Sequence, residues 1–229
     1  AHLGKWHLGE GPETGPLAQG FQLNVGGNQR GHPPTYFSPY SNPDLPDGPE
    51  GEHLTARMAD EAIAFLASCG GRPFFLDLSF FAVHTPIQPT AAGLEATRSR
   101  PPGELHRNPR YAALLEDMDH QIGRVLDALD RLGLADDTLV VLTSDNGGAG
   151  EQTSMAPLRG CKGTPYEGAV RVPWVVRWPG RVPAARTCDV PVIGIDLYPT
   201  WAELCGAPLP EGQPLDGVSL ASLWLGTGE

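Results

Sequence analysis

The sequence predicts an α/β fold with a mostly parallel β-sheet and helices on both faces. Segments with helical periodicity at 54–69 and 109–133 alternate with short apolar segments at 74–83 and 138–143, which are typical of buried strands. This alternation favours a parallel sheet covered by helices. Polar residues directly follow the apolar segments, as expected where the carboxyl ends of strands form a ligand crevice.

Composition and charge limit the possible partners. The 229 residues suffice for one α/β domain with a hydrophobic core, and the formal net charge of −11 disfavours nucleic acid as the main partner. A local cluster of basic side chains can still bind a small anionic substrate. No apolar run approaches the roughly 18 to 20 residues of a membrane span. The cysteines show no zinc or redox spacing and leave the number of disulfides open: Cys69, Cys161, Cys188 and Cys205.

The first ten residues predict a short strand with two basic side chains on one face. Lys5 and His7 alternate with Trp6 and Leu8, and a period of two sends alternate side chains to opposite faces of a strand. An ammonium group beside an imidazole can hold an anion and transfer a proton. An edge strand with two ordinary polar residues is the alternative interpretation, and these ten residues alone favour it.

A long irregular loop is expected from 11 to 51, where Gly, Pro, Asn and Ser dominate. The aromatic residues Tyr36, Phe37 and Tyr40 favour an ordered loop. Arg30 and His32 could face a substrate, but the loop composition favours a solvated surface for both.

The helix predicted at 54–69 carries an apolar stripe that should pack on the sheet. The strand predicted at 74–83 is nearly all apolar, so Asp77 within it needs a partner or an edge position. The strand leads into His84, followed by Thr85 and Pro86. A histidine at the carboxyl end of a strand is well placed for chemistry, although a single such histidine is more often a structural hydrogen-bonding residue.

The clearest helix is predicted at 109–133, with His120 off its apolar stripe and therefore in solvent. The next strand, at 138–143, leads into Asp145 and Asn146. A carboxylate beside a carboxamide offers the hard oxygen ligands that Ca²⁺ or Mg²⁺ prefers. A plain turn is the alternative, because Asp and Asn bond their own backbone readily.

The glycine-rich run after this strand suits a loop that binds an anion, because it carries Arg159, Lys162 and Arg171. A strand at 169–178 and a helix at 195–205 are expected to follow. If three of the strands are parallel, their carboxyl ends meet at one edge. That edge would then collect the candidate site residues Lys5, His7, His84, Asp145, Asn146 and Lys162.

Four stretches, taken in this order, resemble the sulfatase family of the alkaline phosphatase superfamily over essentially the whole chain. They are GKWHLG at 4–9, HTPIQP at 84–89, TSDNGG at 143–148 and LRGCKGTPYEGAVRVP at 158–173. The resemblance implies an alkaline phosphatase-like fold and hydrolysis of a sulfate ester of a carbohydrate or an aryl alcohol. It also favours an exported, periplasmic or extracellular protein, and it leaves the oligomeric state open.

The resemblance implies a role for each matching residue. Asp145 and Asn146 match ligands of a single divalent metal ion, usually Ca²⁺, with Mg²⁺ as an alternative. Lys5 and Lys162 match lysines that hold sulfate oxygens. Fixed cations of this kind would balance the charge of the transferred sulfuryl group.

The two histidines match residues that move protons or contact the nucleophile. His84 matches the histidine that binds sulfate and protonates the leaving oxygen, and His7 matches the one that contacts the nucleophile and helps expel sulfate. Arg159 and Arg171 occupy retained family positions that we expect to be structural, and we expect no chemistry from Cys161.

One departure from the family concerns the nucleophile. Sulfatases use a formylglycine made within a C/S-x-P/A-x-R motif, with two further metal-binding aspartates near the amino terminus, and none of the cysteines fits that motif. We therefore expect residues 1–229 to be part of a sulfatase catalytic domain, incomplete at both ends. The nucleophile segment would lie upstream of Ala1, and most or all of a smaller C-terminal subdomain would lie downstream. The 229 residues alone should not turn over substrate.

Two other functions stay open. A phosphodiesterase or phosphonate hydrolase of the same superfamily is disfavoured, because two-metal members place histidines around an Asp-His-Gly motif where this chain has Asp145-Asn146-Gly147. A non-catalytic relative could bind sulfated glycans with the same pocket after losing the nucleophile.

Overall fold

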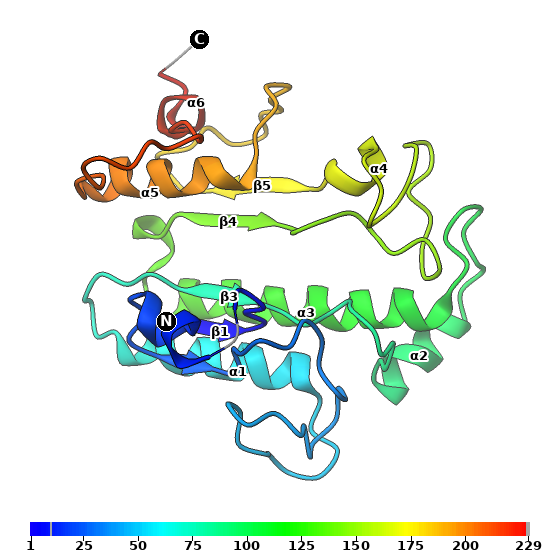
Figure 1. Ribbon diagram of the computed structural model, residues 1–229. Coiled ribbons are helices and arrows are strands. Elements are labelled where there is room, and N and C mark those ends of the chain that lie inside the picture. Colours follow the sequence, from blue (N-terminus) through cyan, green and yellow to red (C-terminus); the bar gives the residue numbers. More distant parts are fainter. Residues whose placement is uncertain (10, 228–229) are drawn as a thin grey trace. The chain divides into compact units, whose positions relative to one another are not determined.

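The computed structural model describes residues 1–9 and 11–227 and divides into two compact units (Figure 1). Unit 1 comprises Ala1–Leu134 and Gly148–Pro157, and unit 2 comprises Ala135–Gly147 and Leu158–Glu229.

Unit 1 contains a three-stranded parallel sheet in the order β2-β1-β3, with β1 at His2–Gly4, β2 at Asn24–Val25 and β3 at Asp77–Ser79. Strand β1 pairs with both neighbours, and His2 lies opposite Asp77. The parallel pairing of β1 and β3 confirms the arrangement expected for the first two strands that lead to candidate site residues.

Strand β1 ends before the residues that were predicted to alternate along it. Gly4 has a φ of 100°, a left-handed conformation that turns the chain out of the strand. A Cβ at this position would lie 2.0 Å from the Ser79 carbonyl oxygen, so only glycine fits here. The predicted alternation over Lys5–Leu8 is therefore wrong, and Leu8 is 68% exposed.

Strand β3 is shorter than the apolar segment 74–83 that predicted it. Its partner β1 offers only three residues to pair with, so β3 has the same length. The apolar residues after β3 serve the core instead, where Phe81 is buried. Asp77 has the partner that its position required: its Oδ2 lies 2.8 Å from Nδ1 of the buried His2, and Ser79 donates to its Oδ1.

The predicted helices of unit 1 are confirmed with small shifts at their ends. Helix α1 spans Leu54–Ser68 and α3 spans Pro109–Arg131, and the two pack against each other (Figure 1). Helix α3 begins with the Asn108 side chain accepting hydrogen bonds from two backbone N–H groups, followed by proline in the first turn. His120 is exposed, as its position off the stripe predicts.

Helix α2, at Ala91–Arg98, was not predicted and packs against α3. Thr90 caps it by accepting a hydrogen bond from the Gly93 N–H. Asp117 of α3 in turn accepts hydrogen bonds from the Thr90 backbone and hydroxyl, at 2.8 and 2.9 Å. Threonine before an alanine pair was the available sequence signal, but the helix is short and contains no fully buried residue.

The long loop is ordered because its aromatic residues form part of the core. Tyr36 and Tyr40 are buried with side chains of α1, α3 and the segment after β3, and this cluster contains Tyr36, Tyr40, Leu45, Leu54, Met58, Phe81 and Leu114. Within the loop lie β2 and the short 3₁₀ helices η1 at Pro12–Thr14 and η2 at Pro16–Gln19. The expectation of an ordered loop is confirmed.

Unit 2 is built on a two-stranded antiparallel sheet of β4 at Val140–Thr143 and β5 at Trp174–Arg177. The strand predicted at 169–178 begins later, because Ala169 and Val170 close helix α4 at Glu167–Val170. Its antiparallel pairing differs from the mostly parallel sheet expected. The remaining elements are η3 at Ala135–Asp137, η4 at Gly194–Asp196, α5 at Leu197–Cys205 and α6 at Ala221–Leu225.

The structure also bears on disulfide bonds and on membrane-spanning helices. All of the cysteines are free, Cys69 within the core and Cys188 and Cys205 at the surface. Among the described residues, no helix combines the length and the apolar character that a membrane crossing requires.

Candidate active site

The candidate residues of unit 1 follow the carboxyl ends of the paired strands β1 and β3. Lys5 comes directly after β1, and its backbone N–H donates to the Ser79 carbonyl oxygen at 2.8 Å. His84 comes five residues after the end of β3, and its backbone N–H donates to the Phe81 carbonyl oxygen at 2.9 Å. Parallel strands thus deliver both segments to the same edge of this sheet.

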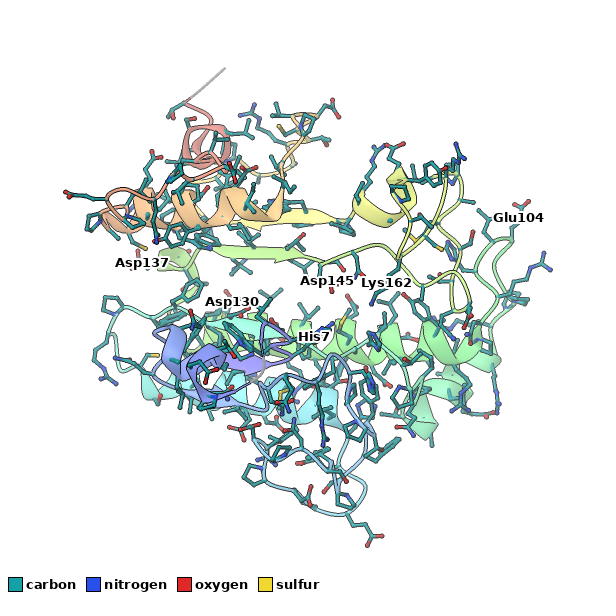
Figure 2. The ribbon with its side chains drawn as sticks, in the orientation of Figure 1. His7, Glu104, Asp130, Asp137, Asp145 and Lys162 are labelled. Atoms are coloured by element: carbon teal, nitrogen blue, oxygen red, sulfur yellow. The ribbon has the colours of Figure 1, made fainter. Side chains whose placement is uncertain are left out.

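His7 is exposed and has a left-handed backbone conformation, with a φ of 57° (Figure 2). Its N–H donates to the Asn28 carbonyl oxygen at 2.9 Å, which ties it to the long loop. Its imidazole lies against Gly31, since a Cβ built on Gly31 would be 2.5 to 2.9 Å from three atoms of the ring. The absence of a side chain at Gly31 is what leaves room for His7.

His84 has hydrogen-bond partners at its ring nitrogen Nδ1 and at its carbonyl oxygen. Its Nδ1 lies 3.1 Å from the Thr85 carbonyl oxygen and 3.2 Å from the Thr85 hydroxyl. Because a carbonyl oxygen only accepts hydrogen bonds, we assign the proton to Nδ1 in the neutral ring. The Tyr36 hydroxyl donates to the His84 carbonyl oxygen at 3.0 Å, and burial raises the pKa of Tyr36, which keeps that donor protonated.

His32 of the long loop stacks on His84, with ring centroids 5.7 Å apart and an interplanar angle of 17°. The sequence favoured a solvated surface for His32, and the structure corrects this in part: the residue is exposed, yet one face of its ring covers His84. Stacking across a separation of more than fifty positions leaves no signal in a single sequence. The structure therefore brings His7 and His84 to one short segment, Gly31–His32.

In unit 2, Asp145 lies in the turn after β4 (Figure 2). Asn146 is the next residue of the same turn. The glycine that follows is buried and fixes this turn: Gly147 donates its N–H to the Ala169 carbonyl oxygen at 2.8 Å. A Cβ on Gly147 would lie 2.0 Å from the Gly168 carbonyl oxygen, so the close approach of these backbones requires glycine. The turn is thereby joined to the start of α4.

The donor set of this turn fits two of the ligands of a hard divalent cation. The Asn146 amide nitrogen donates to the Asp145 carboxylate, and rotation of the amide by a half-turn would present its oxygen beside the carboxylate instead. Ca²⁺ takes about 6 to 8 oxygen ligands, so this pair would supply only part of a shell. Within residues 1–9 and 11–227, no group of three or more His, Cys, Asp or Glu side chains forms a metal site.

Lys162 is exposed at the tip of a tight turn in unit 2 (Figure 2). Thr164 closes the turn, since its backbone N–H and its hydroxyl both donate to the Cys161 carbonyl oxygen, at 3.1 and 2.8 Å. Arg159 lies 3.7 Å over the ring of Tyr166 and donates to its hydroxyl at 2.8 Å. These contacts hold the base of the turn, which presents Lys162 to solvent as a point charge.

Arg171 and Cys161, which lie in the same family stretch, make contacts that stabilise the local backbone. Arg171 forms a 2.9 Å ion pair with Glu167 one helical turn away. Cys161 takes part in the turn through its backbone. Within unit 1, the structure thus places His7 and His84 against one loop segment, Gly31–His32, and within unit 2 the side chains of the neighbouring Asp145 and Asn146 are hydrogen-bonded. The meeting of all six candidates in one pocket stays a prediction.

A protein-family model described as Sulfatase matches residues 1–207 of the chain. Steryl-sulfatase of Mus musculus is 43% identical over 187 residues, which cover 77% of this chain and 28% of that protein. N-acetylgalactosamine-6-sulfatase of Canis lupus familiaris is 31% identical over 252 aligned positions, which cover 98% of this chain and 46% of that protein. The chain thus spans less than half the length of these relatives.

Among solved structures, the crystal structure of Ps i-CgsB in complex with k-i-k-neocarrahexaose is similar to this chain. The two share a TM-score of 0.87 and 30% sequence identity over 99% of this chain and 55% of that chain. The solved structures similar to this chain have the alkaline phosphatase-like fold, which confirms the predicted α/β class. The family model covers nearly the whole chain, and the chain therefore belongs to the sulfatase family.

Proposed function

We propose that the protein carrying this chain hydrolyses sulfate esters, of a sulfated carbohydrate or an aryl sulfate. The observation that carries the proposal is the placement of His7 and His84 against one loop segment, Gly31–His32. These are the two histidines that the family resemblance assigns to proton transfer and to contact with the nucleophile. A positioned proton donor such as His84 assists cleavage of a bond to a poor leaving group.

The distribution of lysine supports the same proposal. The chain has 16 Lys and Arg residues, and Lys5 and Lys162 are its only lysines. Every other basic position uses arginine, so lysine is kept where the sulfatase motifs have it. A compact ammonium group can contact one oxygen of a tetrahedral sulfate without the planar geometry that arginine imposes. We infer that both lysines bind sulfate oxygens.

Asp145 and Asn146 would hold a divalent cation, for which Ca²⁺ is the family's usual ion. When bound, Ca²⁺ would neutralise sulfate charge, and a formylglycine within a C/S-x-P/A-x-R motif would supply the nucleophile. Residues of this chain would orient the substrate and donate the proton. Lys5 and Lys162 orient the sulfate, and His84 donates a proton to the leaving oxygen.

The relatives indicate the substrate class. One is named for sterol sulfates, another for N-acetylgalactosamine 6-sulfate, and the crystal structure holds a neocarrahexaose. We propose an alcohol or sugar as the leaving group, which makes a proton donor such as His84 necessary, because an alkoxide is a poor leaving group in water.

The test is sulfate release by the protein that contains this chain, produced with its formylglycine formed. Sulfate and phosphate esters of the same alcohols are compared by ion chromatography. Turnover of the sulfate esters, lost in Lys162→Ala and retained in the exposed control Arg98→Ala, is the expected result. Preference for the phosphate esters would show a phosphohydrolase. Binding of sulfated oligosaccharides without turnover would show a non-catalytic relative.

A further inference from the structure

The stacking of His32 on His84 has a defined geometry, and a hydrogen bond orients the His32 ring. The two rings are nearly parallel, at 17°, with centroids 5.7 Å apart, a geometry typical of offset stacking. Nδ1 of His32 lies 3.3 Å from the Pro33 carbonyl oxygen, which orients that ring. One face of the His84 imidazole is therefore covered by a second flat ring.

The segment that carries His32 is anchored on both sides. The Asn28 side chain donates to Asn42 Oδ1 at 2.8 Å and to Asp44 Oδ2 at 2.9 Å, and its own Oδ1 accepts the Arg30 backbone N–H. The Arg30 guanidinium donates to the Ser41 carbonyl oxygen at 2.8 Å. The backbone just before His32 therefore has a defined position.

Anchoring continues after His32. Gln88 accepts hydrogen bonds from the Thr35 hydroxyl and from the Tyr36 N–H, and Tyr36 donates to the His84 carbonyl oxygen. The loop thus holds the backbone of His84 at one point and covers its ring at another. Such an arrangement limits rotation of the imidazole about the bond that joins it to Cβ.

We propose that His32 is a positioning residue, which holds the imidazole of His84 in the orientation that delivers a proton to the leaving oxygen. The inference deepens the proposed function and rests on it. As the bond between sulfur and the leaving oxygen breaks, its electron pair stays on that oxygen. The oxygen takes the proton from the His84 imidazolium, the ring becomes neutral, and the sulfuryl group passes to the enzyme's nucleophile.

A positioning role predicts an effect that depends on the leaving group. An alkoxide from a sugar needs the proton during bond cleavage, whereas a nitrophenolate leaves without one. Loss of His32 should therefore slow turnover of a sugar sulfate and leave that of 4-nitrophenyl sulfate nearly unchanged. A general structural defect would slow both substrates together.

The experiment uses the formylglycine-containing protein with His32→Ala, His32→Phe and the control His120→Ala, which replaces an exposed histidine on α3. For His32→Ala we expect kcat on the sugar sulfate to fall by about 10- to 100-fold with KM changed less than about twofold, as for loss of part of a general-acid contribution. His32→Phe keeps a flat ring and should restore most of kcat. His120→Ala should match the wild type on both substrates.

The possible outcomes separate the positioning role from the proposed function. An equal loss of kcat on both substrates in His32→Ala, or no loss on either, overturns the positioning role while sulfatase activity stands. A His32→Phe protein that is slow only on the sugar sulfate also overturns it, since the imidazole and not its stacking would then matter. If His32→Ala fails to fold, His32→Phe alone decides, with near-wild-type kcat as the supporting result. A wild-type protein that releases no sulfate refutes the proposed function and the inference together.

Discussion

Gly31 shows how one missing side chain can determine the position of a candidate catalytic group. A Cβ on this residue would lie 2.5 Å from Cε1 of His7, closer than non-bonded atoms approach. We predict that Gly31→Ala displaces the His7 ring and lowers kcat by at least about tenfold, because misplacement of a catalytic group by about 1 Å has a large effect on rate. The measurement is kcat for sulfate release.

A matched glycine separates this steric effect from backbone rigidity. Gly123 lies within α3, and a Cβ there would meet no atom within 4 Å. Gly123→Ala should leave kcat unchanged and raise stability slightly, by about 0.5 to 1 kcal/mol, through better helix propensity. Equal activity of the two variants would contradict a role for Gly31 in placing His7.

His53 makes a second residue-scale prediction, on the pH dependence of stability. Burial against Tyr36 and Phe37 lowers the pKa of His53 from its ordinary value of 6.5, although its Nε2 lies 2.9 Å from the Gln88 carbonyl oxygen. The unfolded chain thus takes up a proton at a higher pH than the folded chain. Stability contributed by neutral His53 is complete above pH 6.5 and is lost as the pH falls through the folded pKa.

Urea denaturation at several pH values between 7.5 and 5 tests this sign. The free energy of unfolding should decline toward acid in the wild type, and the decline should be smaller in His53→Gln, whose amide can still donate to Gln88. An identical pH slope in the two proteins would assign the acid sensitivity to other groups.

At the scale of elements, the capping of α3 gives the clearest energetic prediction. The Asn108 side chain accepts hydrogen bonds from the N–H groups of Arg110 and Tyr111, at 3.1 and 3.2 Å. Asn108→Ala should destabilise the protein by about 1 kcal/mol, because two N–H groups at the helix start lose their partner. Asn108→Asp retains the acceptor and should remain close to the wild type. Chemical denaturation of the whole protein measures both, and equal losses would contradict capping as the cause.

The helices and strands differ in how far the sequence predicts them. Helices α1 and α3 begin at the predicted residues, because their apolar stripes repeat over four turns or more. Strand β3 is much shorter than its apolar segment, because strand length depends on the partner, and β1 ends at Gly4. Strand β5 is antiparallel to β4, which no local pattern in either segment reveals.

At the scale of the whole molecule, the prediction concerns what the 229 residues can do without other segments. The sequence contains no C/S-x-P/A-x-R motif, so the chain alone should release no sulfate from any ester. A longer protein that carries such a motif should be active, and chelation of divalent ions should lower its activity. Readdition of Ca²⁺ should restore it, because Asp145 and Asn146 offer the hard oxygen ligands that Ca²⁺ prefers.

Metal binding can be followed without activity. Calcium titration by calorimetry on the longer protein should show one site, weakened in Asp145→Ala by about 10-fold or more, as for loss of a charged ligand. Asp119→Ala removes an exposed carboxylate of α3 and should bind calcium like the wild type. Unchanged affinity in Asp145→Ala would remove this residue from the proposed calcium site.

The sequence by itself determined the α/β class, the main helices and the membership of the sulfatase family, because periodicity and motifs are local and survive in the order of residues. It also named His7 and His84 as candidates. Only the tertiary structure decided that both lie against Gly31–His32, that β1 ends before Lys5, and that β4 pairs with β5. These features depend on contacts between segments far apart in the chain, and local composition does not encode such contacts.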